Sequence, residues 1–365
     1  MNFDLSDDAK TLKEAARKFL DARAGPPVAR KVMDAGATHD AALWAEVVEQ
    51  GWPAARVPEA HGGLGLGPDE ACVLAEQMGR SLAPVPLLST MGAIEAILLA
   101  GTDAQKAHWL PKLASGEAVG TIAWAEGNAR SPTATPDARL SGGTVSGMKA
   151  PVTDGLVATV AIVTVASADG PAMAIVALDT IAREPVETLD LVRPSAKLHF
   201  DRTPAEALGT AADWVKLTEQ LAVLSAWEAL GTADAARDMT VAYAKERVAF
   251  GQRIGRYQGV KHKLADMYIL SELARAHALH GCWAWSAGAP ELAQAAAAAR
   301  VSSLDALKLT AEESVQLHGG IGFTWEHDCQ FYYRRNRQIA SSLGSRSHWA
   351  DRLVRALEQR NRAAA

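Results

Sequence analysis

Residues 243–267 read YAKERVAFGQRIGRYQGVKHKLADM, a stretch in which two helical patterns meet at a glycine-containing segment. Arg247 is a fixed planar cation suited to a pyrophosphate, and Phe250 offers an apolar face beside it. We expect Gly251 to end the first helix and to allow a ligand to approach closely. Gln258 is expected to begin the next helix, with an amide that can bond a cofactor. The stretch therefore predicts long helices joined by a binding segment.

A second glycine motif follows the next long helical pattern. Residues 291–318 are rich in Ala and Leu and end at Gly319 and Gly320, which are typical C-terminal stop signals. These two glycines expose backbone N–H groups with no side chain in the way, a plausible nest for phosphate. Apolar stripes with a spacing of three to four residues also run through 214–230 and 260–270. Long helices with short loops predict an antiparallel bundle over residues 211–365.

The chain before this bundle divides into two parts. Residues 119–210 contain short β-branched runs bounded by Gly, Asp and Ser, such as 157–165 and 172–178, which predict a small β domain. Residues 1–118 are helical in pattern, with Ser6 as a helix cap. The glycine-rich loop at 62–67 lacks the Gly-Lys-Ser/Thr of a phosphate-binding loop, so we favour a tight turn between helices over a ligand contact. The predicted fold is mainly α with a central β domain, in three domains: 1–118, 119–210 and 211–365.

Composition narrows the possible functions. The 365 residues carry a formal net charge of -5, which argues against a nucleic-acid partner. No apolar run reaches the ~20 residues of a membrane helix and the N-terminus does not resemble a signal peptide, so we expect a cytoplasmic protein with no membrane partner. Three scattered cysteines fit a reducing compartment. His277 and His280 lack a plausible third ligand, so no metal is expected. The arginines between 334 and 362 are interpreted as a solvated helix face, with an anion-binding surface as the alternative.

These motifs resemble the acyl-CoA dehydrogenase family. The resemblance covers nearly the whole chain and includes VPEAHGGLGLG at 57–67, Gly147-Met148-Lys149 followed by Thr153-Asp154-Gly155, and QLHGGIGFTWE at 316–326. The helix–β–helix order is also that of the family. The resemblance implies an N-terminal helical domain, a small β-barrel-like middle domain and a C-terminal four-helix bundle.

The resemblance also implies FAD as the cofactor, bound across a subunit interface. Arg247, Phe250, Ile254 and Gln258 would hold the adenine and pyrophosphate end, while Gln316, Gly319 and Gly320 would come from a neighbouring subunit. Trp124, Ser131 and Thr153 match the positions that line the flavin ring. Ser345 keeps the hydroxyl of the family's catalytic segment and is a further candidate for cofactor binding.

The chain departs from the family at the catalytic base. In the family a carboxylate removes the α-proton of the acyl-CoA while the β-hydrogen leaves as hydride. The two positions where the family carries that base hold Leu343 and Leu221, which cannot accept a proton. Glu219 lies two residues before Leu221, about 200° around a helix, and becomes a candidate base only if the helix is shifted. Asn128 and Arg130 also replace two family glycines.

This mixture resembles the base-lacking subunits of bacterial heterotetrameric acyl-CoA dehydrogenases that act on bulky CoA thioesters such as steroid side chains. We therefore predict an FAD-dependent subunit that dehydrogenates a CoA thioester at the α,β positions with a base-bearing partner, and electron-transfer flavoprotein as the acceptor. One alternative is a self-sufficient homotetramer with an unusual base. The other is an inactive scaffold, which would have no need of Arg247, Phe250, Gln316 and Gly320 together.

Overall fold

The computed structural model describes residues 4–127, 131–168 and 170–364. Helices occupy the first part of the chain, strands the middle and helices the rest, so the predicted class, mainly α with a central β domain, is confirmed. The domain limits at 118 and 210 stay a prediction. The chain forms two compact units, one of Met1–Ala29, Cys72–Ala83 and Ala222–Ala365, the other of Arg30–Ala71 and Pro84–Leu221.

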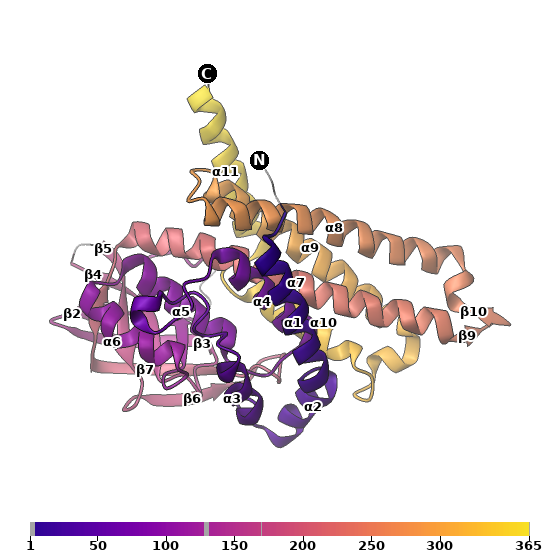
Figure 1. The fold of residues 1–365 in the computed structure, drawn as a ribbon, viewed down its shortest axis with the longest axis horizontal. Coiled ribbons are helices and arrows are strands. Elements are labelled where there is room, and N and C mark those ends of the chain that lie inside the picture. The colour runs from indigo at the N-terminus through magenta and orange to yellow at the C-terminus, as the bar shows by residue number, and fades with distance from the viewer. Residues whose placement is uncertain (1–3, 128–130, 169, 365) are drawn as a thin grey trace. The chain divides into compact units, whose positions relative to one another are not determined.

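The elements follow one another along the chain in Figure 1. The first helices are α1 (Asp7–Arg23), α2 (Pro26–Ala35), α3 (Ala41–Glu49), α4 (Pro68–Ser81), α5 (Leu87–Ala100) and α6 (Asp103–Ala114). The main strands are β1 (Gly120–Ala123), β2 (Arg139–Ser141), β3 (Thr144–Thr153), β4 (Val160–Ser167), β5 (Gly170–Ala177), β6 (Ala182–Val186), β7 (Ser195–Pro204) and β8 (Glu206–Leu208). The later elements are α7 (Ala211–Glu246), β9 (Val248–Ala249), β10 (Gln252–Arg253), α8 (Gln258–Ser286), α9 (Leu292–His318), α10 (Cys329–Ser341) and α11 (Arg346–Ala364).

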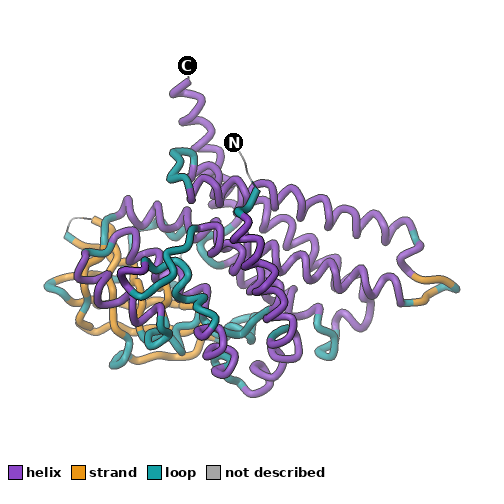
Figure 2. Tube along the Cα trace, in the orientation of Figure 1, coloured by secondary structure: helices purple, strands orange, loops and turns teal. Residues whose placement is uncertain are grey.

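Strands β1 to β8, orange in Figure 2, form one mixed sheet. Their order is β6-β7-β3-β2-β4-β5-β8, with β1 beside β4. Strand β4 pairs in parallel with β1 and β2, whereas its pairing with β5 is antiparallel. The residues of β4 from Val160 to Val165 are all buried, which explains why this strand reads as a continuous apolar run rather than an alternating one.

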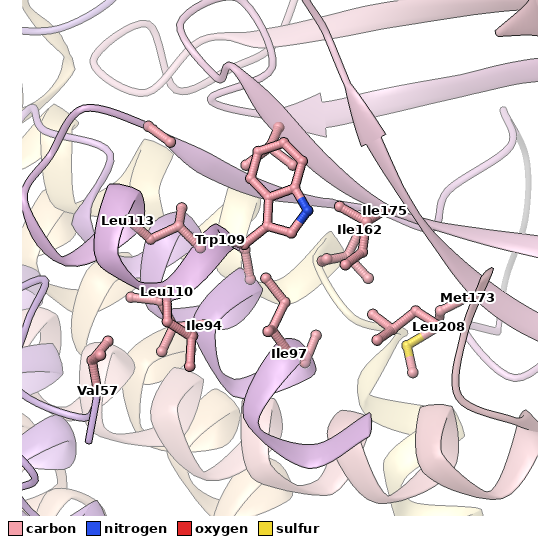
Figure 3. Packing of buried hydrophobic residues seen from close by; sticks show 14 of the residues in the cluster. Val57, Ile94, Ile97, Trp109, Leu110, Leu113, Ile162, Met173, Ile175 and Leu208 are labelled. Atoms are coloured by element: carbon pink, nitrogen blue, oxygen red, sulfur yellow. The ribbon is translucent and has the colours of Figure 1, made fainter. Parts of the chain in front are cut away.

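The hydrophobic core of the unit formed by Arg30–Ala71 and Pro84–Leu221 lies between helices and the sheet. Ile94 and Ile97 of α5 and Leu110 of α6 are fully buried and belong to the same cluster as Ile162 and Ile175 of β4 and β5 (Figure 3). Helix α5 is apolar all round, with no amphipathic stripe, because it is enclosed on most sides. That lack of a stripe is the reason the sequence pattern did not reveal this helix.

The glycine-rich segment forms the predicted tight turn. A short 3-10 turn at Glu59–His61 ends at Gly62, which has a left-handed φ of 78°. A Cβ on Gly63 would lie 1.9 Å from the Val57 carbonyl oxygen, so only glycine allows this close backbone approach. Packing of the turn on itself is therefore sufficient to explain these glycines.

The unit that contains Ala222–Ala365 is helical. Helix α8 runs along α9, and α10 and α11 also pack against α9 (Figure 1). The short β9–β10 hairpin joins α7 to α8 at the far end of these two helices (Figures 1 and 2). No helix within the described residues has both the length and the hydropathy that a membrane span requires.

Candidate functional site

The hairpin between α7 and α8 presents Phe250 to solvent. Helix α7 ends at Glu246, so the expectation that Gly251 ends this helix is wrong. Phe250 and Gly251 are instead the two loop residues between β9 and β10, with φ values of 51° and 83°. Two positive φ values in a two-residue loop match the twist of the flanking strands. The left-handed backbone costs a phenylalanine energy and leaves its side chain 97% exposed, which points to a binding role rather than core packing.

A cavity of about 730 Å³ lies beside this hairpin, within one chain. Phe250 and Ile254 line it together with Gln316 of α9, so both sequence motifs meet at one place. The expected contribution of Gln316, Gly319 and Gly320 from a neighbouring subunit stays a prediction, because the structure describes a single chain. The remaining lining residues are Ala249, Tyr257, Gly259, Val260, Lys263, Glu312, Glu313 and Leu317. The cavity has the size and the mainly apolar lining of a cofactor site.

Hydrogen bonds fix the walls of this cavity. The Tyr257 hydroxyl donates to the carbonyls of Ala249 and Phe250 at 2.9 and 3.2 Å, which ties the start of α8 to the hairpin turn. Two further lining residues, Lys263 of α8 and Glu313 of α9, form an ion pair. The sequence did not single out these three residues, because neither a tyrosine before a helix nor a partly buried charge pair carries a recognisable motif.

The other predicted residues of the two motifs lie close by in the chain but outside the cavity lining. Arg247 follows α7 directly and is exposed, and Gln258 begins α8 as predicted. Helix α9 ends at His318, so Gly319 and Gly320 follow it as predicted. Both glycines are exposed, and a Cβ on either would meet no atom within 4 Å. Their backbone is therefore open to an approaching ligand.

The β-domain candidates belong to the other unit. Trp124 follows β1, is half-buried and packs against the apolar cluster of Figure 3. Thr153 ends β3, and its carbonyl accepts a hydrogen bond from the Thr121 hydroxyl at 2.7 Å. The next residue, Asp154, has a φ of 57° and accepts hydrogen bonds from Ser89 at 2.5 Å and Arg193 at 3.2 Å. These contacts hold the left-handed turn that ends β3, and an aspartate tolerates that conformation better than most residues.

A buried ion pair holds both ends of the segment that contains Ser131. The Lys149 Nζ is fully buried and lies 2.5 Å from Glu126 Oε1. Glu126 also accepts the backbone N–H groups of Asp137 and Ala138 at 2.6 and 3.0 Å. Although burial opposes it, these N–H groups and Lys149 hold the pKa of Glu126 below its usual value, so the carboxylate stays charged.

Ser131 lies within the segment that this pair anchors. Its hydroxyl is 3.0 Å from the hydroxyl of Thr133 and is half-buried. Asn128 and Arg130, which replace two family glycines, lie outside the described residues.

The turn at Leu343 is rigidly held. Leu343 has a φ of 53°, is 6% exposed, and its carbonyl accepts a hydrogen bond from the buried Trp349 indole at 2.8 Å. Arg300 donates to the carbonyls of Ile339 and Ser342 at 2.5 and 2.8 Å. The Ser345 hydroxyl accepts a hydrogen bond from the backbone N–H of His348 at 3.2 Å and so caps the start of α11. The backbone at the position where the resemblance predicts the base is thus held by several hydrogen bonds, and the side chain there has no acid–base group.

The second base position is also apolar. Leu221 of α7 packs against the cluster of Figure 3, and a Cβ on Gly92 would lie 3.2 Å from its Cδ2. Glu219 is buried at 8% exposure on the same helix. Helix α7 continues as regular α-helix through both residues, so Glu219 and Leu221 lie on different faces of it.

The C-terminal arginines are largely engaged within the chain. Arg335 is 2% exposed and pairs with Glu228 at 3.5 Å. Arg337 and Arg346 pair with Glu312 and Asp305 of α9 at 3.0 and 2.7 Å, and Arg334 stacks on Trp325. These contacts do not support a shared anion-binding surface, because each of these cations already has a partner in its own chain.

Comparison with known sequences identifies the class of protein. Residues 6–117 match the family described as acyl-CoA dehydrogenase, N-terminal domain, and residues 216–356 match acyl-CoA dehydrogenase, C-terminal domain. The chain is 33% identical over 341 residues to acyl-CoA dehydrogenase IpdE2 of Mycolicibacterium smegmatis, covering 93% of this chain and 96% of that protein. It is 28% identical to benzylmalonyl-CoA dehydrogenase of Aromatoleum aromaticum, covering 92% and 93% of the two chains. The chain belongs to the acyl-CoA dehydrogenase family and is an oxidoreductase of that type.

Solved structures agree with this assignment. A structure of a variant of the Tcur3481-Tcur3483 steroid ACAD is 31% identical, with a TM-score of 0.91 over 98% of this chain and 99% of that chain. Butyryl-CoA dehydrogenase of Megasphaera elsdenii, at 23% identity, has the same fold, with a TM-score of 0.89 over 98% and 100% of the chains.

The Glu126–Lys149 pair leads to a first prediction. Replacing Glu126 with Gln leaves the Lys149 ammonium buried without its counter-ion, and we expect the free energy of unfolding to fall by about 3–5 kcal/mol. Chemical denaturation followed by circular dichroism measures the loss. Glu184→Gln is the matched control, because Glu184 pairs with Lys197 at the exposed edge of the same sheet and its loss should leave the unfolding curve unchanged. Equal curves for the two variants would show that the buried pair does not hold this segment.

Proposed function

We propose that this chain is the FAD-binding, base-lacking subunit of an acyl-CoA dehydrogenase that works with a base-bearing partner. The single observation that carries the proposal is the contrast between its two sites. The cavity at Phe250, Ile254 and Gln316 has the form of a cofactor site, whereas Leu343 and Leu221 place hydrocarbon at both positions of the family base.

The described residues suit the adenine and pyrophosphate part of FAD. The exposed ring of Phe250 and the side chain of Ile254 offer apolar surface for a heterocycle, and Gln316 offers an amide for hydrogen bonding. Gly319 and Gly320 leave their backbone open, and Arg247 supplies a cation for the pyrophosphate. When bound, FAD supplies the two-electron chemistry of the dehydrogenation. Trp124, Ser131 and Thr153 are proposed to line the flavin ring.

The absence of a base sets the division of labour. Dehydrogenation of a CoA thioester removes a proton from the α-carbon and a hydride from the β-carbon, so a carboxylate within hydrogen-bond reach of the α-carbon is required. Leu343 stands where that carboxylate belongs, although Arg300 and Trp349 keep the turn in order. A carboxylate on a homologous partner subunit would then accept the proton.

The names of two relatives bear on the substrate and the assembly. The name of the Tcur3481-Tcur3483 steroid ACAD contains two components and a steroid. IpdE2 is similar to this chain over nearly the full length of both proteins. We infer a heterotetramer that acts on a bulky, polycyclic CoA ester, such as one from steroid degradation. Electron-transfer flavoprotein is the inferred acceptor, because the flavin must be reoxidised after each turnover.

Flavin content tests the proposal that this chain binds FAD. Phe250→Ala removes the exposed aromatic face of the cavity, and we expect the affinity for FAD to fall about 30-fold, or about 2 kcal/mol, as for the loss of a central aromatic contact. The ratio of flavin absorbance to protein after purification and dialysis measures this change.

Leu273→Ala is the control for this variant. Leu273 is 55% exposed on α8 but does not line the cavity, so its loss should leave the flavin content unchanged. A chain that is colourless both alone and when co-expressed with a homologous partner would instead favour the inactive scaffold.

A carboxylate introduced at position 343 tests the proposal that this chain lacks only the catalytic base. In Leu343→Glu the held turn presents an acid–base group, and we expect dye reduction by an acyl-CoA to rise about 10²–10⁴-fold above the level of the unmodified chain alone, the usual contribution of a positioned base. Leu343→Gln is the matched control, because it has the same length without a basic carboxylate, and it should stay inactive.

Two results would contradict the proposed division of labour. Robust dye reduction by the unmodified chain alone would mean that it has its own base, as a self-sufficient homotetramer would. A yellow, folded Leu343→Glu variant without activity on any acyl-CoA would mean that more than a carboxylate is missing.

A further inference from the structure

Three metal-binding side chains lie together between the end of α9 and the start of α10. His318 is the last residue of α9, Cys329 is the first of α10, and His327 precedes it in the connecting segment. One ligand atom from each of the three residues lies within 4.8 Å of the others. The two imidazole rings are 4.2 Å apart between centroids. Two imidazole nitrogens and one thiol are ligands that Zn²⁺ accepts.

Hydrogen bonding prepares His318 to act as a ligand. Its Nδ1 lies 2.7 Å from the Ser314 carbonyl oxygen, so Nδ1 must carry the proton and donate it. The Nε2 atom therefore presents a lone pair. A bond from the second ring nitrogen to a backbone carbonyl is the usual way in which a protein orients a metal-binding histidine.

The Nε2 atom of His318 has no hydrogen-bond partner among the described residues, although the side chain is 2% exposed. A buried acceptor without a donor is costly, and native structures rarely leave one without a water or an ion. This orphaned atom is an independent sign that something binds at the cluster.

The other two side chains require small adjustments. The Cys329 thiol now donates to the Gly322 carbonyl at 3.3 Å, and burial raises the pKa of this thiol to about 11. The Nδ1 of His327 accepts the Cys329 N–H at 3.2 Å, a long bond that a metal bond can replace. A tetrahedral Zn²⁺ needs its nitrogen and sulfur donors about 3.3–3.7 Å apart, so the segment between them must contract slightly.

We propose that His318, His327 and Cys329 form a binding site for a single Zn²⁺ ion, with water as the fourth ligand. The Zn–S bond forms as the Cys329 thiol proton is released to solvent, and no electron is transferred. The ion joins the two ends of the segment that contains Gly319 and Gly320 and so restrains it. This site does not depend on the proposed function. Its spacing of nine and then two residues matches no standard zinc motif, which is why the sequence pattern predicted no metal.

The test uses the purified full-length chain, with whatever flavin it carries, after treatment with a chelator. Isothermal titration with Zn²⁺ should show one ion bound per chain, and Zn²⁺ should raise the thermal unfolding midpoint, because it binds only the folded site. Titration with Co²⁺ should give the intense ultraviolet charge-transfer band of a thiolate–cobalt bond.

Cys329→Ser is the decisive variant. The serine hydroxyl keeps a donor for the Gly322 carbonyl but is a poor zinc ligand, so we expect the Zn²⁺ affinity to fall at least about 100-fold and the charge-transfer band to vanish. Cys282→Ser is the matched control, because Cys282 is also a buried free cysteine of the same unit, and this variant should bind like the unmodified chain. The proposal is overturned if the chain binds no Zn²⁺, if Co²⁺ gives no thiolate band, or if Cys329→Ser binds Zn²⁺ as tightly as Cys282→Ser does.

Discussion

The C-terminal helices depend on one buried cation. Arg300 of α9 is fully buried and donates to the Ser225 hydroxyl of α7 at 2.6 Å and to two carbonyls at the end of α10. Burial lowers the pKa of Arg300 to about 10, which still leaves it charged at neutral pH. A guanidinium on α9 can hydrogen-bond to both α7 and the end of α10 because its donors are arranged in a rigid plane. The arginine thereby holds the turn at Leu343, the position where we expected the family's base.

With this constraint, the proposed loss of the base is a local change. Leu343 has a left-handed backbone, the Trp349 indole donates to its carbonyl, and Arg300 donates to the carbonyl of the preceding residue, Ser342. In the proposed function only the side chain at this position differs from the family pattern, with a hydrocarbon in place of an acid. At the hairpin, by contrast, the chain maintains a strained and fully exposed Phe250. A protein that had lost all ligand binding would gain nothing from that strain, so the two features together favour a working half of a shared site.

The sequence predicted those parts of the molecule that local patterns determine. Helix α9 and its glycine stop follow from a long Ala- and Leu-rich run, and β4 follows from a β-branched run. Helix α5 was missed, because a fully enclosed helix has no polar face to set its period. The Phe250–Gly251 turn was misassigned to a helix end, because a glycine after a helical pattern indicates a helix stop as readily as a hairpin.

The candidate site was predictable in its residues and less so in its geometry. The motifs at 243–267 and 316–326 predicted Phe250, Ile254 and Gln316 as binding residues. Only tertiary packing brings these residues to one cavity within one chain. The ion pair of Lys149 and Glu126 was not foreseen as a unit, although each residue belonged to a recognised segment. The spacing of His318, His327 and Cys329 did not predict their cluster, because the end of a helix and the segment after it bring the three side chains together.

In the proposed function this chain cannot remove the α-proton of an acyl-CoA by itself. The most direct measurement is the exchange of deuterium from the α-carbon of acyl-CoA esters, from straight-chain to polycyclic, incubated with the purified chain and followed by mass spectrometry. We expect no washout above the rate without protein, and washout once a carboxylate-bearing partner is added. Washout by the chain alone, abolished by Glu219→Gln, would contradict it, because the chain would then have a base of its own.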